Sequence, residues 1–410
     1  MFDDNFRSEI DALLAPADAQ ARLFPGEAAT RQPVHTVYVP AGQFGASTCT
    51  QWGERALALL AERAPTAAAL AEAAGLSPEL IEDVYPRLIT KLGSQPIEDV
   101  RVDFEDGYGL RPDAEEDEAA TAAGIALAEL ARRPDAPLLA GTRIKGLQAS
   151  TRWRGLKTLE LLVSSAVSRG GLPSRFVVTL PKVAHVAEVQ AGVRVLSFLE
   201  SSFGLAEGSL RLELQIEVPQ AVYSPDGTAA VARLIHAASG RCEGLHYGTY
   251  DFSAAAGVVA GYQSLEHPLA DHAKAVMQLA AAQTGVRVSD GSTNVIPFGS
   301  EVPAAWKLHA RLVQRALERA LYQGWDLHPG HLVSRYAATY QFYRAQLDPS
   351  AARLKTYTEK AASGVMDEPA TAQALANAVL RAVECGACDE DEVFRACGLD
   401  RSALLVLARR

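Results

Sequence analysis

The chain has few cysteines and lacks the patterns of a secreted or membrane protein. Five cysteines in 410 residues are few and odd in number, so they give no disulfide framework. No apolar run approaches the about 20 residues that a membrane span needs, and the N-terminus MFDDNFRSEI lacks the pattern of a signal peptide. The net charge of −10 argues against nucleic acid or an anionic membrane as the main partner. We therefore expect a cytoplasmic protein with no nucleic-acid or membrane partner.

What the chain does contain is a series of short apolar, β-branched stretches that alternate with helical patterns. We expect strands at 34–40, 98–107, 137–145, 174–183, 212–220, 244–253, 286–291 and 324–329. Strict alternation predicts a parallel sheet, and the count of eight predicts a closed (β/α)8 (TIM) barrel of the α/β class. The competing fold, an open doubly wound sheet, normally has a G-x-G-x-x-G turn after its first strand, which PAGQFGAST (40–48) lacks.

Two helical additions accompany this barrel. Residues 65–95 predict a helical hairpin that superficially resembles a helix-turn-helix, but Glu79, Glu82 and Asp83 stand where a DNA reader carries basic or amide side chains. We therefore expect the hairpin to pack outside the barrel. After Pro329 the sequence predicts only helices, at 333–347, 349–362, 369–384 and 390–409. We divide the chain into a barrel domain, 1–348, and a C-terminal helical extension, 349–410.

The C-terminal extension carries apolar residues at helical spacing, among them Val379 and Leu380. Such a face needs a second apolar surface, which is either a partner subunit or the barrel of the same chain. The pair Cys385-x-x-Cys388, with Cys397 nearby, suggests zinc, but a second C-x-x-C or a histidine pair is missing. The functions of the hairpin and of this cysteine pair are not set by the sequence.

Charged and titratable residues follow seven of the expected strands at one end, where barrel enzymes have their active sites. They are Asp103, Glu105, Asp106, Arg143, Lys145, Lys182, Glu217, Asp251, Asp290 and His328. Glu217 and Asp251 end two strands joined by a helical run, so both carboxylates are expected at the same edge of the sheet. Such a pair suits Mg²⁺, which typically takes one or two carboxylates plus waters and substrate oxygens. The alternative is that each carboxylate caps a helix or pairs with a nearby arginine.

Most of residues 34–345 resembles the superfamily of the citrate lyase β-subunit and the hydroxy-oxo-acid aldolases, which are Mg²⁺-dependent TIM-barrel lyases. The matching segments occur in the family's order: VHTVYVP, VDFEDGYG, GTRIKG, TLPKVAHVAEV, LQIEVPQAV, LHYGTYDFSAAAGV, VSDGSTNV and QGWDLHPGHL. Each motif is short and degenerate, but their order is specific for the superfamily. It is not specific for a substrate.

The resemblance implies a role for each matched position. Glu217 and Asp251 fall at the metal-ligand positions, and Arg143 falls at the position that binds the oxo or carboxylate oxygens of the substrate. The other implied site residues are Gln215, which supports the metal site, the acidic pair Glu105 and Asp106, the substrate-carboxylate loop Gly248 and Thr249, and Lys182 as a further substrate-binding residue.

Two departures mark a divergent branch. Arg143 is followed by Ile144-Lys145 where the citrate-lyase pattern has Val-Asn, and Asp106 stands where the aldolase branch has a histidine. We therefore do not assign the substrate of either branch to this protein, and the sequence leaves open whether CoA takes part in the reaction. The resemblance also implies a homo-oligomer, a trimer or a hexamer, which favours a partner subunit as the surface that the C-terminal helices cover.

These residues suit a carbon–carbon lyase or aldolase acting on a 2-oxo or hydroxy acid, free or as a CoA thioester. Mg²⁺, or Mn²⁺ in its place, and a guanidinium would stabilise the enolate as it forms. The alternatives are a Schiff-base aldolase using Lys145 or Lys182, a CoA-thioester hydrolase, and a catalytically silent barrel that binds an oxo acid. Asp106, His246 or a metal-bound water is the candidate base.

Overall fold

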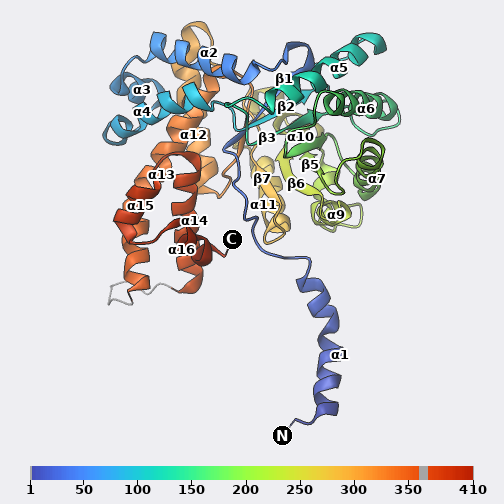
Figure 1. Ribbon diagram of the computed structural model, residues 1–410. Coiled ribbons are helices and arrows are strands. Elements are labelled where there is room, and N and C mark those ends of the chain that lie inside the picture. The colour runs from blue at the N-terminus through green and yellow to red at the C-terminus, as the bar shows by residue number, and fades with distance from the viewer. Residues whose placement is uncertain (1, 360–367, 410) are drawn as a thin grey trace.

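The barrel predicted from the sequence is confirmed. The computed structural model describes residues 2–359 and 368–409, and within them one parallel sheet has the order β7-β6-β5-β4-β3-β2-β1-β8 (Figure 1). Its strands are β1 His35–Pro40, β2 Asp99–Asp103, β3 Leu139–Arg143, β4 Phe176–Leu180, β5 Leu210–Ile216, β6 Cys242–Tyr247, β7 Arg287–Ser289 and β8 Gly324–Asp326. A parallel bridge from Ser289 to Gln323 joins β7 to the start of β8. Eight parallel strands thus form a nearly closed TIM barrel, with helices between them.

The strands are buried on both faces, as in other parallel sheets whose faces are covered. Every residue of β2, β3 and β4 is buried. Gly141 in β3 shows how closely the strands approach, because a Cβ at this position would overlap the carbonyl oxygen of Val177 in β4. The sequence between the strands supplies the outer layer of helices.

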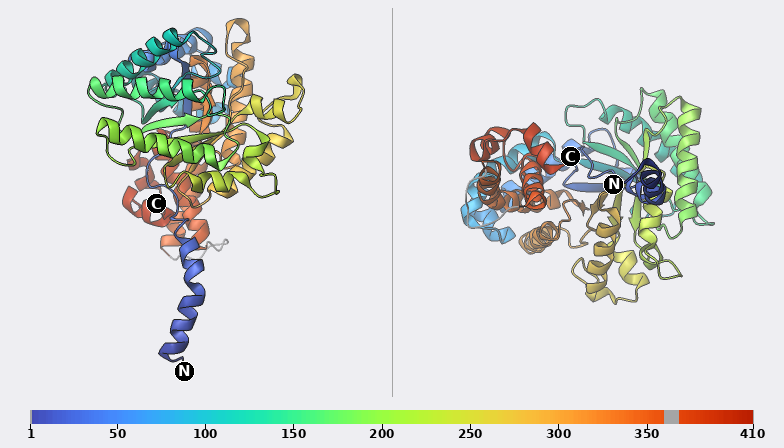
Figure 2. Two further views of the ribbon diagram at one scale, coloured as in Figure 1. Left: turned by 90° about the vertical axis from the view of Figure 1, so that its right-hand side faces the viewer. Right: turned by 90° about the horizontal axis from the view of Figure 1, so that it is seen from below.

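The helices between the strands cover the outside of the barrel (Figure 2). They are α2 Thr48–Arg63, α5 Asp113–Leu130, α6 Arg152–Ser168, α7 Val186–Phe203, α9 Ala230–Ala237, α11 Pro268–Ala281 and α12 Val302–Glu318. Short helices α8 Pro219–Val222 and α10 Thr249–Ala255 follow β5 and β6 directly. The start of α7 is fixed by a capping box, in which His185 accepts from the helix backbone and Glu188 accepts from the backbone of His185.

The additions form a helical layer beside the barrel. The expected hairpin is present as α3 Ala67–Ala74 and α4 Pro78–Ser94, which pack against α2, α12 and α13. The chain continues as α13 Pro329–Thr358, α14 Pro369–Cys385, α15 Glu390–Cys397 and α16 Arg401–Ala408.

Two helix boundaries in the C-terminal extension were predicted wrongly. The expected helices 333–347 and 349–362 form the single helix α13 as far as Thr358, which includes Pro349, and 360–362 lie outside the described residues. The expected helix 390–409 is split into α15 and α16, because Gly398 ends α15 in the left-handed region with a φ of 72°. The division at 348/349 falls inside α13, and the division into a barrel domain and a C-terminal helical extension remains a prediction.

The apolar faces of the C-terminal helices pack within the same chain. Val379 and Leu380 of α14 and Leu404 of α16 are buried, and α14 lies against both α13 and α16. This is the alternative to a partner subunit that the sequence left open. Contact of these helices with a partner is not needed to cover the residues named here.

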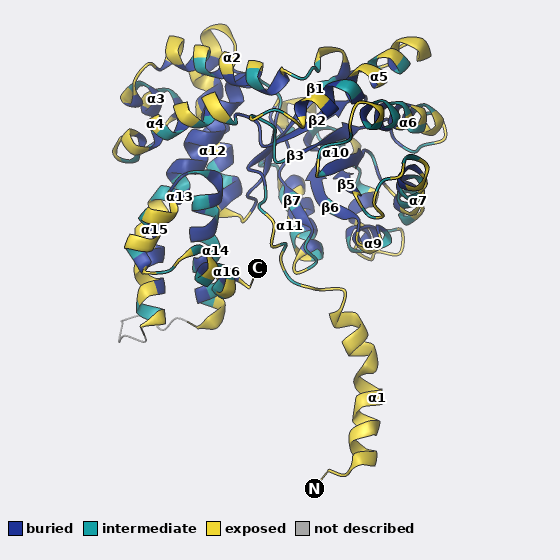
Figure 3. Cartoon of the chain, viewed as in Figure 1, coloured by how far each residue is buried: buried dark blue, intermediate teal, exposed yellow. Residues whose placement is uncertain are grey.

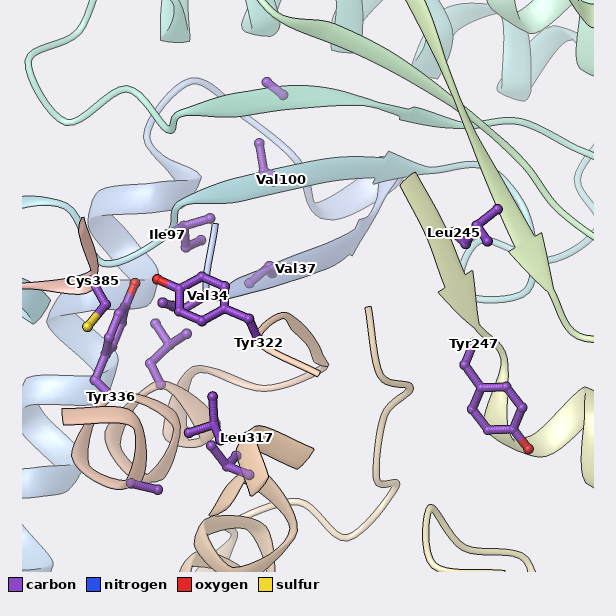
Figure 4. Close-up of a cluster of buried hydrophobic side chains, with 14 of the residues drawn as sticks. Val34, Val37, Ile97, Val100, Leu245, Tyr247, Leu317, Tyr322, Tyr336 and Cys385 are labelled. Carbon is purple, nitrogen blue, oxygen red and sulfur yellow. The ribbon is translucent and has the colours of Figure 1, made fainter. Parts of the chain in front are cut away.

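The layer joins the barrel through an aromatic core at the amino ends of the strands. Figure 4 shows Tyr322 and Tyr336 beside Cys385 of α14, close to Val34 and Ile97 of the barrel. All five cysteines are free and buried, and burial raises the pKa of the Cys385 thiol. Among the described residues, no group of three or more His, Cys, Asp or Glu side chains is placed to hold a metal ion by itself. The cysteine pair therefore belongs to the hydrophobic core.

Helix α1, Asp4–Ala21, stands away from the rest of the chain (Figures 1 and 3). It has no buried residue, and its apolar side chains Phe6, Leu13 and Leu14 are exposed. Neither α1 nor any other helix in the described segments is long and apolar enough to cross a membrane.

Candidate active site

A cavity of about 380 Å³ opens at the carboxyl ends of the strands. Its lining includes Asp106, Arg143, Glu217, Gly248, Thr249 and Asp251, which are six of the nine site residues expected from the sequence. The other three, Glu105, Lys182 and Gln215, contact Arg143 or Asp251 directly. A larger cavity of about 650 Å³ lies between the barrel and α14 and is lined by none of these residues. We place the site in the smaller cavity because the titratable groups converge there.

Arg143, the last residue of β3, is held by carboxylates and by aromatic rings. Its Nε and one terminal nitrogen donate to the two oxygens of Asp103, at 2.6 and 2.7 Å, and another terminal nitrogen lies 3.3 Å from Glu105. Its guanidinium carbon lies 4.9 Å from the centre of the Tyr38 ring and 5.4 Å from that of Trp325. Although burial opposes it, Asp103 and Glu105 raise the pKa of Arg143, so this side chain is a permanent cation.

Asp103 was considered as a strand-end acid but not assigned to the site. It pairs with Arg143 in the register between β2 and β3, so the two residues end adjacent strands at the same height. Matching the last residues of neighbouring strands would have found this pair. Tyr38 and Trp325 were also missed, because they meet Arg143 only once β1 and β8 close the barrel.

Gln215 lies in β5 and is fully buried beside Arg143. Its side-chain oxygen is 3.4 Å from a guanidinium nitrogen. Its amide nitrogen, by contrast, has no hydrogen-bond partner among the described residues. A buried donor without a partner costs about 1–3 kcal/mol, so this amide has a donor to offer a ligand oxygen.

Lys182 lies at the centre of the acidic side chains. Its ammonium contacts Glu105, lies 3.0 Å from Asp106 and lies 3.5 Å from Asp251. Although partial burial opposes it, Glu105 and Asp106 raise the pKa of Lys182, so the amine stays protonated. Its φ of 53° is unusual for a residue with a side chain, and strained backbone of this kind concentrates at functional sites.

Glu217 is the most deeply buried of the expected metal ligands, with 1% of its surface exposed. Burial is the main cause that raises its pKa to about 7, and the neighbouring acids Glu105 and Asp251 add to the effect. The backbone N–H of Lys182 donates to one carboxylate oxygen at 2.7 Å. A Cβ at Gly248 would lie 2.6 Å from the other oxygen, so glycine is needed for β6 to pass this close.

The charges around the cavity do not balance. Among the described residues, five carboxylates (Asp103, Glu105, Asp106, Glu217 and Asp251) meet two cations, Arg143 and Lys182, which leaves three more negative than positive groups when all are ionised. A surplus of carboxylate oxygens fits a hard divalent cation. Glu217 and Asp251 therefore fit Mg²⁺, which needs no complete protein cage because it typically keeps waters and substrate oxygens.

Other candidates from the sequence have structural partners. Lys145 donates to Glu116 at 2.6 Å, and Lys274 binds Asp290 at 2.9 Å. His328 accepts from the N-terminus of α13, through Gly330 N at 3.1 Å. Asp106 lines the cavity, and so it is better placed to act as a base than these residues.

His246 is also bound below the cavity rather than within its lining. Its Nε2 lies 2.8 Å from Glu213 and its Nδ1 lies 3.2 Å from the Tyr38 hydroxyl. The ring is 2% exposed and is not part of the cavity lining, although it contacts Tyr38, which is.

The site thus lies at the carboxyl ends of the strands of a TIM barrel, the fold that the sequence predicted. The chain is similar to the structure of a citrate lyase from Burkholderia xenovorans LB400, with 17% identity, a TM-score of 0.58, and coverage of 92% of this chain and 98% of that one. At this identity the similarity establishes the fold alone. The chain belongs to the family described as "Domain of unknown function (DUF6986)", whose model matches residues 14–410.

Two further solved structures are more distant. RipC from Yersinia pestis has 18% identity and a TM-score of 0.45, covering 76% of this chain and 95% of its own. A Haloferax volcanii malate synthase complex with magnesium and glyoxylate has 15% identity and a TM-score of 0.48, covering 86% of this chain and 99% of its own. No curated protein matches the sequence.

Proposed function

We propose that this protein is a Mg²⁺-dependent carbon–carbon lyase or aldolase that acts on a 2-oxo or hydroxy acid, free or as a CoA thioester. The observation that supports this most strongly is the joint presence of Arg143 and a surplus of carboxylates in one cavity at the carboxyl ends of the strands. Breaking a bond next to a carbonyl leaves an enolate, and its developing negative charge needs fixed positive groups. Arg143 supplies one such group from the protein.

The proposed roles follow from where each side chain lies. Glu217 and Asp251 would hold Mg²⁺, or Mn²⁺ in its place. When bound, the cation would supply electrostatic stabilisation of the enolate charge. Arg143 and the amide of Gln215 would bind substrate oxygens, and the backbone at Gly248 and Thr249 would receive a substrate carboxylate. Because the guanidinium is fixed by Asp103, it is oriented before the substrate arrives.

Proton transfer is assigned to the acidic pair beside Lys182. Burial raises the pKa of Glu105, whereas hydrogen bonds from Glu105 and Lys182 lower that of Asp106 against the effect of burial. Asp106 is thus the ionised member that can accept a proton, and Lys182 would orient it. A Schiff base at Lys182 is disfavoured because the same acids keep its amine protonated.

The quaternary structure proposed with this function is a homo-oligomer, a trimer or a hexamer. Val379, Leu380 and Leu404 of the C-terminal helices are covered within the chain, whereas the exposed Phe6, Leu13 and Leu14 of α1 offer an apolar face for contact with a second copy. Light scattering on the full chain tests this. A monomer at micromolar concentration would contradict it.

The reaction is tested by supplying Mg²⁺ or Mn²⁺ with a panel of 2-oxo acids, hydroxy acids and their CoA esters. We expect a new carbonyl product from at least one acid, and its loss when a chelator is added. Release of free CoA without a new aldehyde or oxo acid would identify a thioesterase instead. Binding without turnover would identify a sensor.

A further inference from the structure

The cavity at the carboxyl ends of the strands has two different walls. The charged wall comes from the ends of β2, β3, β5 and β6 and contains Arg143 and the carboxylates Asp103, Asp106, Glu217 and Asp251. The opposite wall is formed by Tyr38 and Pro40 at the end of β1 and by Trp325 and Leu327 at the end of β8. Because β1 and β8 are paired neighbours, this second wall is continuous. It carries apolar and aromatic side chains where the first wall carries charges.

Arg143 stands at the boundary between the two walls. One edge of its guanidinium is bound to Asp103, while the rings of Tyr38 and Trp325, 4.2 Å apart between centroids, lie within 5.4 Å of it. A substrate carboxylate or oxo group bound by Arg143 therefore has charge on one side and apolar surface on the other. The rest of the substrate's carbon skeleton is directed toward the apolar wall. Packed against the charged wall instead, the skeleton would remove water from the carboxylates without offering them a hydrogen bond.

The loop that follows β7 begins in the cavity lining at Ser292 and carries three apolar residues further along. Val295, Ile296 and Phe298 are all exposed, Phe298 by 74%. The loop is fixed on both sides, since Asn294 N donates to the hydroxyl of Tyr250 at 2.6 Å and His331 donates to Val295 O at 3.0 Å. Tyr250 lines the cavity and His331 lies in the first turn of α13. Apolar side chains held exposed beside a cavity are typical of a ligand-binding surface.

The size of the cavity agrees with a substrate larger than a minimal oxo acid. Its volume of about 380 Å³ lies within the roughly 300–1,000 Å³ of pockets that hold drug-sized ligands. An apolar substituent that packs on this wall gains about fourfold in affinity for each methylene group removed from water. The charged wall fixes the acid end, so the apolar wall is left to select the substituent.

We infer that the substrate is an oxo or hydroxy acid whose carbon skeleton carries an apolar substituent, such as an aromatic ring or a branched alkyl chain. This inference rests on the proposed function, because it assigns the acid end to Arg143 and the carboxylates. The substituent lies against Pro40 and Leu327 and reaches the loop at Ile296 and Phe298.

The inference is tested by measuring the binding of oxamate and N-phenyloxamate, in the presence of Mg²⁺, to the full-length protein by calorimetry. Both compounds present a carboxylate beside a carbonyl, and they differ in the apolar ring. We expect N-phenyloxamate to bind at least tenfold more tightly. In Leu327→Ser and Phe298→Ser this ratio should fall at least threefold, because the Kd of N-phenyloxamate rises more than that of oxamate. Equal binding of the two compounds by the unaltered protein would overturn the inference.

Phe198→Ser is the matched control, because Phe198 is 60% exposed on α7 and lines no part of the cavity. An equal fall of the ratio in this control would also overturn the inference. The test separates the two proposals. If no acid is cleaved or condensed while the preference for the phenyl compound persists, the proposed reaction fails and the apolar wall stands. If short oxo acids turn over but the preference is absent, the reaction stands and the inference falls.

Discussion

Two buried ionic clusters lie one above the other in this barrel, and they differ in how a central glutamate of each is stabilised. In the lower cluster Arg101 contacts Asp99 and donates to Glu213 at 2.7 Å. Glu213 also accepts from Thr179 at 2.7 Å and binds His246 at 2.8 Å. Although burial opposes it, Arg101 and His246 lower the pKa of Glu213, so this carboxylate is stabilised as the anion, whereas burial raises the pKa of its neighbour Asp99.

The upper cluster, at the cavity, has the opposite balance. Burial raises the pKa of Glu217 to about 7, with a further contribution from Asp251, because the two cations nearby do not offset the acids. A folded protein can keep such a surplus when a ligand supplies the missing positive charge. We therefore regard the lower cluster as part of the fold and propose that the upper cluster holds a bound cation.

Removing an expected metal ligand should have the largest effect. Glu217→Gln and Asp251→Asn should each lower kcat/KM by about 10³-fold or more, since the enolate loses an electrostatic contact worth on the order of 10²–10³ and the cation is also bound less tightly. Steady-state assays with Mg²⁺ on the substrate found by screening measure this. Asp290→Asn is the matched control, because Asp290 is bound to Lys274. Full activity after exhaustive chelation would contradict the metal assignment.

Breaking the lower cluster should damage the fold instead. Arg101→Met leaves Asp99 and Glu213 buried without their cation, which should lower the free energy of unfolding by about 3–5 kcal/mol. Urea denaturation followed by circular dichroism measures this. A change below about 1 kcal/mol would show that the lower cluster is not a stabilising unit.

Arg143→Lys should reduce activity without unfolding the protein. Lysine keeps the charge but loses the planar fork that binds both oxygens of Asp103 and presents further donors to the substrate. We expect kcat/KM to fall on the order of 10²-fold. The urea concentration at the midpoint of unfolding should be close to that of the cavity variants Glu217→Gln and Asp251→Asn. A variant as active as the unaltered enzyme would remove Arg143 from the site.

The smallest expected effect is a gain of stability in Glu217→Gln without metal. The pKa of Glu217 is about 7 in the folded protein, against a usual 4.5. As the pH rises between these two values, the carboxyl ionises in the unfolded chain before it does so in the folded protein, and the free energy of unfolding falls. At pH 8 in the presence of a chelator, the glutamine variant should therefore be more stable by about 1–3 kcal/mol. At pH 4 the two proteins should be equally stable, because the carboxyl is protonated in the fold. A difference that is the same at both pH values would contradict the raised pKa.

The sequence predicted those features of the barrel and its cavity that depend on the periodicity of the strands. Each of the eight strands was expected, and with them the placement of Arg143, Glu217 and Asp251 at one end of the barrel, because parallel strands align their carboxyl ends. It could not predict the charge balance of the site. That balance depends on which residues Lys182 and Arg143 contact, and these partners come from strands far apart in the chain.

Tertiary packing also explains the errors in the helical extension and the missed aromatic wall. The helices expected at 333–347 and 349–362 meet at Pro349, and proline disfavours a helix interior, but packing against α4 and α14 keeps α13 continuous. Tyr38 and Trp325 belong to buried strands, and nothing local in either segment shows that their rings meet beside Arg143.

The central claim, that the carboxylate surplus at the cavity binds a divalent cation, is tested most directly by titrating Mn²⁺ into metal-free protein and measuring the free ion by electron paramagnetic resonance. The account predicts one saturable site per chain in the unaltered protein and in Asp290→Asn, and its loss in the double variant Glu217→Gln/Asp251→Asn. No saturable site in the unaltered protein, or an unchanged site in the double variant, would contradict it.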